Sequence, residues 1–205
     1  MQLFHSPASP FVRKVLVAAH ELGLAGQLTF LPSAVHPVNR DATVVARNPL
    51  GQVPTLLLAD GTELYDSRVI CEYLDSLTTA ATVFPAEPAA RWTALRRQAL
   101  GDGMMGAAVL VRYELVARPE GLRWPAWADG QMEKVTGGLR LLEGEVATFG
   151  DGCDIGLIAI ACAVSYLDLR FPDDDWRARV PGLAAWYKSF SERPSMRATV
   201  LRAPS

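Results

Sequence analysis

The stretch GQVPTLLLADGTELYDSRVI, residues 51–70, decides the fold of the N-terminal half of the chain. Pro54 stands at the entrance to an apolar run, Thr55 to Leu58, and proline is tolerated in sheets mainly at edges and strand starts. Asp60-Gly61 then favours a tight hairpin, whose second strand is expected over Glu63 to Tyr65. The acid–serine pair that follows is typical of a helix start. The stretch therefore predicts a hairpin that leads directly into a helix.

The flanking segments extend this hairpin into a small α/β unit. Gln2 to His5 is expected to form a first strand, and Ser9-Pro10 begins a run with apolar residues at helical spacing up to Leu22. Gln27 to Leu31 is a second strand candidate, followed by a weak helix before the hairpin. The segment SRVICEYLDSL, residues 67–77, predicts the last helix. The order β-α-β-α-β-β-α indicates helices that cover a small mixed sheet.

The rest of the chain is predicted to be helical. Residues 78–88, TTAATVFPAEP, lack periodicity and are interpreted as a linker between an α/β domain, residues 1–77, and an all-α domain, residues 89–205, built as a helical bundle. The expected helices are Ala89 to Ala117, Trp124 to Val146, Asp154 to Leu169, Leu183 to Ser191 and Ser195 to Leu201. The third of these is almost wholly apolar, so we expect it to be buried on all sides.

Composition and charge argue against several classes of function. Lys+Arg 20 against Asp+Glu 22 gives a net charge of −2, and a nucleic-acid binder normally carries a basic face. The first residues lack the apolar region of a signal peptide, and the longest apolar stretch is about ten residues, well below the ~20 that span a bilayer. The three cysteines and three histidines show no ligand spacing. We expect a soluble cytoplasmic protein that binds neither nucleic acid, membrane nor metal.

The two ends of the hairpin suggest a site for a small zwitterionic peptide. If the Val53-Pro54 bond is cis, the backbone N–H and C=O of Val53 turn outward and can pair with an extended peptide; the sequence leaves this open, since only about 5–6% of X–Pro bonds are cis. Ser67 offers a hydroxyl and helix N–H groups to a carboxylate, and Asp66 offers an anion to an amine. Either residue could instead serve only as a helix N-cap.

These motifs and the helical half together resemble the cytosolic glutathione transferases. The N-terminal likeness rests on SPASPFVRK, NPLGQVPTL and LYDSRVICEYLD, and the C-terminal likeness on LGDGMMGAAVLVRYE, IAIACAVSYLDLRF and LAAWYKSFSERPS. The chain is similar to a bacterial branch that includes functionally unassigned members. The resemblance implies a thioredoxin-like N-terminal domain followed by a helical-bundle domain.

The resemblance also implies a glutathione site. In such a site the Val53-Pro54 bond would be cis, and Val53 would pair with the cysteinyl backbone of glutathione. Asp66 and Ser67 would hold the γ-glutamyl end, and Gln52 would lie near the peptide. Glutathione would be a co-substrate, with no metal involved.

The chemistry should depend on the glutathione thiol. Only the thiolate is nucleophilic, and an unperturbed pKa near 8.5 leaves a few per cent ionised at pH 7; lowering that pKa by about two units takes about 2.7 kcal/mol. A hydroxyl at the start of the first helix could supply this by a hydrogen bond, aided by the helix dipole. Ser9 is the candidate that the resemblance to serine-type members favours, with Ser6 as the second, and Phe11 would line the thiol pocket. Ser9 could also be only an N-cap.

Other candidate residues come from the same resemblance. His36 lies in the loop where some relatives place a basic group near the glycine carboxylate. Asp102 lies where some send an acid across the dimer to the γ-glutamyl amine, although a solvated helix acid is the alternative. A pocket for a small apolar electrophile is expected near Met104, Met105 and Tyr113, although methionines at helical spacing are also typical of a core.

Two functions are therefore considered. The first is a glutathione transferase, expected to be a homodimer, that activates glutathione for attack on small apolar electrophiles. The alternative is a non-catalytic member of the same fold, of the stringent-starvation type, that acts by binding other proteins. Ser9, Val53-Pro54 and Asp66-Ser67 favour the first, because a pure scaffold needs no peptide site.

Overall fold

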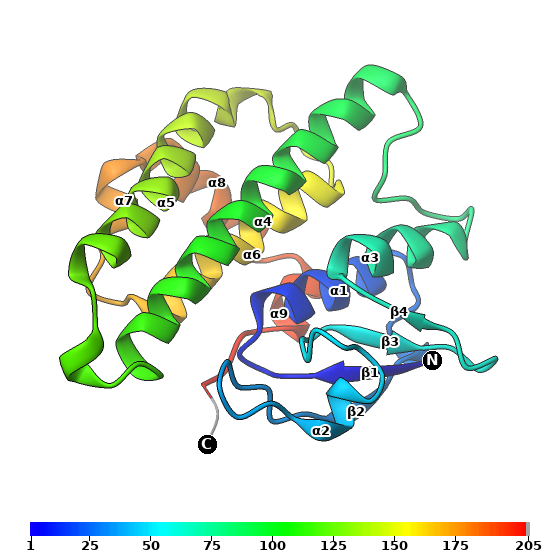
Figure 1. Ribbon diagram of the computed structural model, residues 1–205. Helices are drawn as coiled ribbons and strands as arrows, with labels where there is room; N and C mark the ends of the chain where they lie inside the picture. Colours follow the sequence, from blue (N-terminus) through cyan, green and yellow to red (C-terminus); the bar gives the residue numbers. More distant parts are fainter. Residues whose placement is uncertain (204–205) are drawn as a thin grey trace.

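The computed structural model describes residues 1–203 and consists of a mixed sheet with helices, followed by an all-helical part (Figure 1). The N-terminal elements are β1 (Gln2–His5), α1 (Pro10–Glu21), β2 (Thr29–Pro32), α2 (Ala42–Val45), β3 (Thr55–Leu57), β4 (Glu63–Leu64) and α3 (Ser67–Ser76). The C-terminal helices are α4 (Pro88–Val116), α5 (Pro125–Glu145), α6 (Ile155–Arg170), α7 (Trp176–Arg179), α8 (Pro181–Phe190) and α9 (Pro194–Ala198). Short 3-10 turns are η1 (Ala25–Gln27), η2 (Glu120–Leu122) and η3 (Val146–Thr148).

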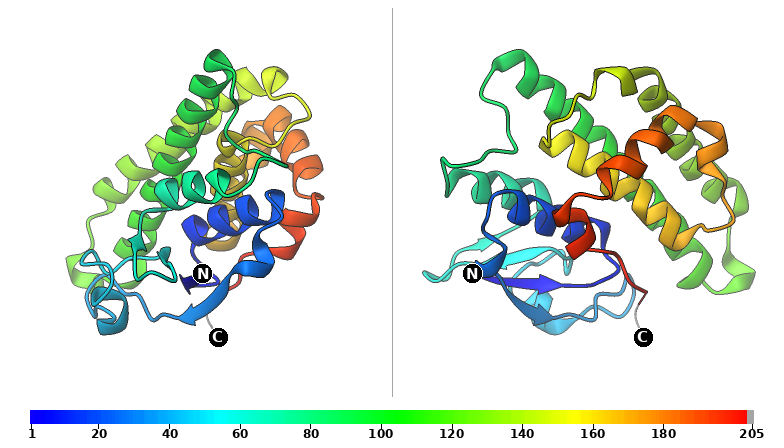
Figure 2. Two further views of the ribbon diagram at one scale, coloured as in Figure 1. Left: turned by 90° about the vertical axis from the view of Figure 1, so that its right-hand side faces the viewer. Right: turned by 180° about the vertical axis from the view of Figure 1, so that it is seen from behind.

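The four strands form one sheet in the order β2-β1-β3-β4. β1 is parallel to β2 and antiparallel to β3, and β3 and β4 form the predicted hairpin. Gly61 has φ +90° in the hairpin turn, a conformation that glycine adopts without steric cost. α1 and α3 cover the face of the sheet that looks toward the helical part, and α2 lies on the opposite side (Figures 1 and 2). The predicted order of strands and helices is therefore confirmed, with helix ends shifted by a few residues.

The apolar helix α6 forms the centre of the helical part, as its composition predicted. Every residue from Ile155 to Leu167 is buried. Glycines let α6 approach α4 closely: a Cβ on Gly156 would lie 2.6 Å from the carbonyl oxygen of Ala94, and one on Gly101 would lie 2.7 Å from the backbone of Ala159. Gly101 thus serves helix packing, and α4 runs without interruption through it. Among the α-helices of residues 1–203, the sequence prediction missed α7, whose four residues are too few to show a helical period; the 3-10 turns were not predicted either.

Polar contacts join the two parts of the molecule around α1. Lys14 reaches Asp102 on α4, and the guanidinium of Arg13 donates to the carbonyl oxygen of Met196 on α9 at 2.9 Å. Glu21, at the end of α1, accepts hydrogen bonds from the Arg193 guanidinium. These contacts hold the helical part against the first helix of the sheet domain. None of the helices within residues 1–203 has the length and apolar character to cross a bilayer.

Candidate functional site

A cavity of about 410 Å³ opens beside the hairpin, between the starts of α1 and α3. Six of the predicted site residues line it together: Phe11, Gln52, Val53, Pro54, Asp66 and Ser67. Five further lining residues were not predicted: Asn48, Leu50, Tyr65, Arg68 and Val69. The tertiary structure thus brings the turn before β3, the start of α1 and the start of α3 to one place.

The loop that forms one wall of the cavity is shaped by a buried asparagine. The Asn48 side-chain amide donates to the carbonyl oxygen of Gln52 at 3.2 Å and to the Thr55 hydroxyl at 3.0 Å, while its side-chain oxygen accepts from the backbone N–H of Leu50. Gly51 has φ +63° at the corner of the loop. Asn48 could have been found from the sequence as a turn-forming residue, but its buried contacts depend on the folded loop.

Val53 lines the cavity, and its backbone is free to pair. The Val53-Pro54 peptide bond is cis, and β3 begins only at Thr55. Among residues 1–203, the N–H and C=O of Val53 form no hydrogen bond with another residue. An unpaired donor and acceptor on one residue at the end of a strand can bind an extended peptide as a short added strand.

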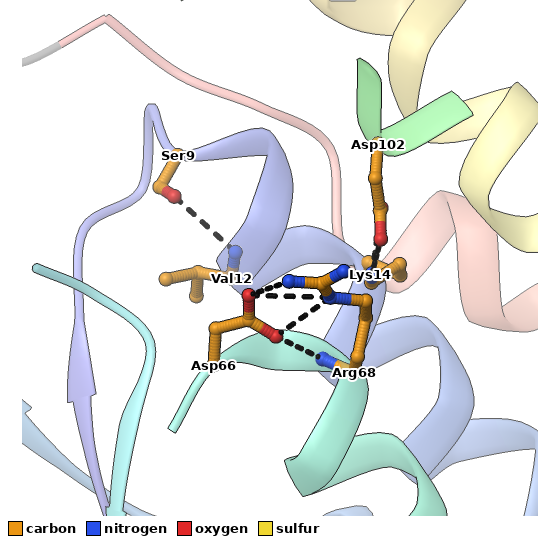
Figure 3. Close-up of polar contacts among 6 residues, drawn as sticks. All are labelled: Ser9, Val12, Lys14, Asp66, Arg68 and Asp102. Carbon is orange, nitrogen blue, oxygen red and sulfur yellow. Dashed lines mark hydrogen bonds and ion pairs between the residues drawn. The ribbon is translucent and has the colours of Figure 1, made fainter. Parts of the chain in front are cut away.

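The start of α3 carries both a charge pair and free helix donors. Asp66 is the N-cap: its Oδ1 accepts from the backbone N–H of Arg68 at 2.9 Å, and its Oδ2 accepts from the Arg68 guanidinium at 2.8 Å (Figure 3). Ser67 is buried and lines the cavity. Because the first N–H groups of a helix have no intrahelical acceptor, this end of α3 can receive a carboxylate.

The pKa values of this charge pair follow from its contacts. Partial burial, the largest single influence, acts to raise the pKa of Asp66, but the hydrogen bonds and charge of Arg68 together lower it below its ordinary value. The same contacts raise the pKa of Arg68. Asp66 is therefore an anion that is partly neutralised by a neighbour and accessible from the cavity.

The start of α1 carries the two serines considered for thiol activation. The Ser9 oxygen accepts from the backbone N–H of Val12 at 3.2 Å, so Ser9 is the N-cap of α1 (Figure 3). A hydroxyl that accepts one hydrogen bond still has its own proton to donate. Ser9 and Ser6 line a second cavity, of about 540 Å³, and Phe11 is the residue at this turn that lines the first.

Asp102 is bound within its own chain. Both carboxylate oxygens accept from Lys14 Nζ, at 2.6 and 2.7 Å (Figure 3), and the Lys14 side chain is fully buried. Burial raises the pKa of Asp102 above its ordinary value, against the opposing charges of Lys14 and Arg68. The alternative of a solvated helix acid is therefore wrong, and the carboxylate already has a partner that competes with any ligand amine.

The remaining predicted residues lie outside the cavity. His36 accepts at Nδ1 from the backbone N–H groups of Val38 and Asn39 in an exposed loop. Met104 and Met105 are 3% and 0% exposed, so the prediction that they line an electrophile pocket is contradicted: they belong to the core. Of that predicted set only Tyr113 reaches the surface.

The described part of the chain also shows no candidate metal centre. Within residues 1–203, no three His, Cys, Asp or Glu side chains gather as a metal would require. What the site offers is a strand-like backbone edge at one end and a pair of opposite charges with free helix donors at the other. These are the complementary groups for a short peptide that carries an amine and a carboxylate at one terminus.

Comparisons with known proteins agree with this geometry. Residues 8–77 match the family described as glutathione S-transferase, N-terminal domain, and residues 125–189 match glutathione S-transferase, C-terminal domain. The chain is 34% identical to the uncharacterized GST-like protein YibF of Escherichia coli K12, over 97% of this chain and 98% of that protein. The chain therefore belongs to the glutathione transferase family.

Two solved structures from Pseudomonas fluorescens Pf-5 are also similar. A glutathione transferase family member with bound glutathione is 47% identical, with a TM-score of 0.95, over 100% of this chain and 99% of that chain. A structure of a family member from the same source holds S-(propanoic acid)-glutathione and is 46% identical, with a TM-score of 0.91, over 99% and 100% of the two chains. The fold expected from the resemblance is thereby confirmed.

Proposed function

We propose that this protein binds glutathione in the 410 Å³ cavity and activates its thiol for attack on small electrophiles. The observation that carries the proposal is the shared cavity formed by the unpaired Val53 backbone and the start of α3. The cysteinyl backbone of glutathione would pair with Val53, and the γ-glutamyl group would meet Asp66 and Ser67. Glutathione bound to a relative of 47% identity supports the same ligand for this chain.

The charges of the γ-glutamyl group complement the start of α3. Its carboxylate would accept from the Ser67 hydroxyl and the free helix N–H groups. Its amine would approach Asp66, which the structure finds paired with Arg68, so ligand amine and guanidinium would share one carboxylate. Toward the glycine end, Gln52 lines the cavity, and His36 would need to move from its present hydrogen bonds to take part.

The thiol would be activated at the start of α1. Ser9 holds this helix start through its oxygen, which leaves its proton available to a thiolate. Charge-assisted hydrogen bonds to a thiolate and the positive end of the helix dipole both lower a thiol pKa. Phe11, on the cavity side of this turn, would cover the sulfur. Ser6 is the second candidate for the hydroxyl.

The test measures binding and thiol ionisation separately. Calorimetric titration should show glutathione binding, weakened by Ser67→Ala, and the ultraviolet absorbance of the thiolate should show a lowered pKa in the complex. Ser9→Gly should abolish the lowered pKa while binding persists, since glycine is itself a tolerated N-cap. Ser6→Gly tests the second candidate: a pKa shift lost in that variant and kept in Ser9→Gly would assign the activating hydroxyl to Ser6. No binding at millimolar glutathione would refute the proposed function. A thiol pKa unshifted in the wild-type complex would refute thiol activation and leave glutathione binding, and a lowered pKa that survives Ser9→Gly would refute only the role of Ser9.

We further propose that the protein is a homodimer. Val69 and Trp92, 47% and 70% exposed on α3 and α4, are large apolar side chains that an interface would cover. Light scattering should give twice the mass of the chain, and Trp92→Glu should shift the protein toward the monomer. A monomer at micromolar concentration would contradict this.

A further inference from the structure

One face of α4 meets α1 near the middle of α4. Asp102 marks this face through its contact with Lys14. Tyr113 is eleven residues further along, which is three helical turns and places it on the same face. Arg112 is adjacent and half-buried. The face therefore continues past the Lys14–Asp102 pair to the phenol of Tyr113, and the guanidinium of Arg112 projects beside it, about 100° around the helix.

α6 presents a matching face. The thiol of Cys162 is buried where the charges of Arg13 and Lys14 reach it, so this side of α6 also faces α1. Tyr166 and Arg170 follow at one and two turns along the helix. The guanidinium carbon of Arg170 lies 6.0 Å from the centre of the Tyr166 ring.

The four side chains form one group at the C-terminal ends of α4 and α6. α4 and α6 pack side by side with Gly156 against Ala94 and Gly101 against Ala159, and three turns further along the same pair of helices this register brings Arg112 and Tyr113 beside Tyr166 and Arg170. Burial raises the pKa of Tyr166, and the charges of Arg170 and Arg112 and the phenol of Tyr113 also act on it. Burial raises the pKa of Tyr113 too, so both phenols stay protonated hydrogen-bond donors. Figures 1 and 2 show these halves of α4 and α6 beside the turn between β1 and α1.

The two arginines of this group have no acidic partner within residues 1–203. Neither Arg112 nor Arg170 takes part in an ion pair there, and the buried Nε of Arg170 has no hydrogen-bond partner. The neighbouring acids are engaged elsewhere: Glu114 binds Arg118, and Asp168 binds Arg177. A carboxylate could therefore pair with the two guanidinium groups and accept hydrogen bonds from the two phenols.

We propose that Arg112, Arg170, Tyr113 and Tyr166 bind a carboxylate of the second substrate, so that this protein transfers glutathione to small carboxylate-bearing electrophiles. The inference rests on the proposed function and names its substrate class. This carboxylate site takes the place of the apolar electrophile pocket that was expected near Met104, because the Met104 side chain is buried in the core. A neutral apolar electrophile would leave these arginines unsatisfied.

The simplest such substrate is a haloacetate. The glutathione thiolate attacks the methylene carbon of iodoacetate, a C–S bond forms, and the C–I bond breaks with its electron pair leaving on iodide. The thiol proton goes to solvent, and the product is S-carboxymethylglutathione. Iodoacetamide reacts in the same way and has nearly the same shape without the charge, so it is the matched neutral electrophile.

Binding of the two products tests the carboxylate site without requiring turnover. S-carboxymethylglutathione should bind more tightly than S-carbamoylmethylglutathione by about tenfold, as expected for charge-assisted hydrogen bonds. Arg112→Gln and Arg170→Gln should each reduce this preference, and Arg170→Lys should retain part of it. Arg140→Gln removes an exposed arginine from α5 and should leave the preference unchanged.

Turnover provides the second measurement. After subtraction of the uncatalysed rate, kcat/KM should be higher for iodoacetate than for iodoacetamide. In Arg170→Gln it should be higher for iodoacetamide. The protein's own thiols are poor competitors, since burial raises the pKa of Cys71 and of Cys153 to about 12 and that of Cys162 to about 11.

The outcomes separate this inference from the proposed function. Glutathione that binds, together with two products of equal affinity, would overturn the carboxylate site and leave the proposed function standing. A preference that survives both Arg→Gln variants would also overturn it. No glutathione binding would refute the proposed function, and this inference with it. Circular dichroism and an unchanged glutathione affinity show that a variant has folded.

Discussion

Replacement of Lys14 by Met should destabilise the protein strongly. The Lys14 ammonium is fully buried and lies 2.6 and 2.7 Å from the two oxygens of Asp102, whose side chain is 13% exposed. Methionine fills nearly the same volume but leaves the carboxylate without its cation. The pair joins α1 to α4, so the loss acts at the junction between the sheet and the helical part.

The expected magnitude follows from the burial of both groups. Removal of one partner from a buried ion pair typically costs about 3–5 kcal/mol, because the other charge stays desolvated. For a chain of this size each kcal/mol lowers the melting temperature by about 2–4 °C, so a fall of about 10 °C is expected. The double variant Lys14→Met, Asp102→Leu should recover most of the loss, since an apolar pair of similar volume carries no such penalty.

Urea unfolding of the two single variants and the double variant gives the coupling energy. Arg91→Met is the matched control: it breaks the pair between Arg91 on α4 and Glu72 on α3, 2.7 Å apart with side chains 35% and 63% exposed. An exposed pair contributes about 0–1 kcal/mol. A loss below about 1 kcal/mol in Lys14→Met, equal to that of the control, would refute the reasoning.

The pH dependence of the Lys14→Met variant gives a further check. Burial already raises the pKa of Asp102 in the folded state, and without Lys14 it should rise further. A carboxyl whose pKa is higher in the folded than in the unfolded state costs stability above that folded pKa and is relieved as the pH falls through it. The difference between wild type and variant should therefore shrink toward acidic pH; a difference independent of pH would contradict this.

Three other substitutions probe the fold and the site. Gly156→Ala should destabilise by about 1–3 kcal/mol, because its Cβ would lie 2.6 Å from the Ala94 carbonyl oxygen, whereas Gly144→Ala meets nothing within 4 Å and should be neutral or stabilising in thermal melts. Asp154→Ala should cost about 0.5–2 kcal/mol as the lost N-cap of α6; an unchanged melting temperature would argue otherwise. The pKa of Asp66 is lowered in the folded state, so its ionised carboxylate stabilises the fold at pH values above its ordinary pKa, and this stabilisation is lost as the pH falls through the folded pKa. The free energy of unfolding of Asp66→Asn, measured in urea, should therefore be lower than that of wild type at neutral pH, and the two values should converge in acid.

The local sequence was sufficient for most of the architecture. The hairpin at residues 55–64, the capped helix that follows it and the apolar α6 each depend on residues close in the chain. Turn chemistry, capping and hydrophobic period act over a few residues, so they can be read without knowledge of the fold. The same local signals placed Val53 and Ser67 at the two ends of one hairpin, which is why the cavity could be anticipated in outline.

Only the tertiary structure determined which side chains are buried and which charged groups pair when the residues are far apart in the chain. Asp102 was predicted to meet a ligand amine across a dimer, with an exposed helix acid as the alternative, but the packing of α1 on α4 buries it against Lys14. The resemblance placed Met104 near a pocket for the second substrate, but its side chain lies in the core, which was the alternative that its helical spacing allowed. Side-chain burial and charge pairing depend on which helix faces which, and no period of 3.6 residues contains that information. For the same reason Arg112 and Arg170, 58 positions apart in the chain, both act on Tyr166 only because α6 lies along α4.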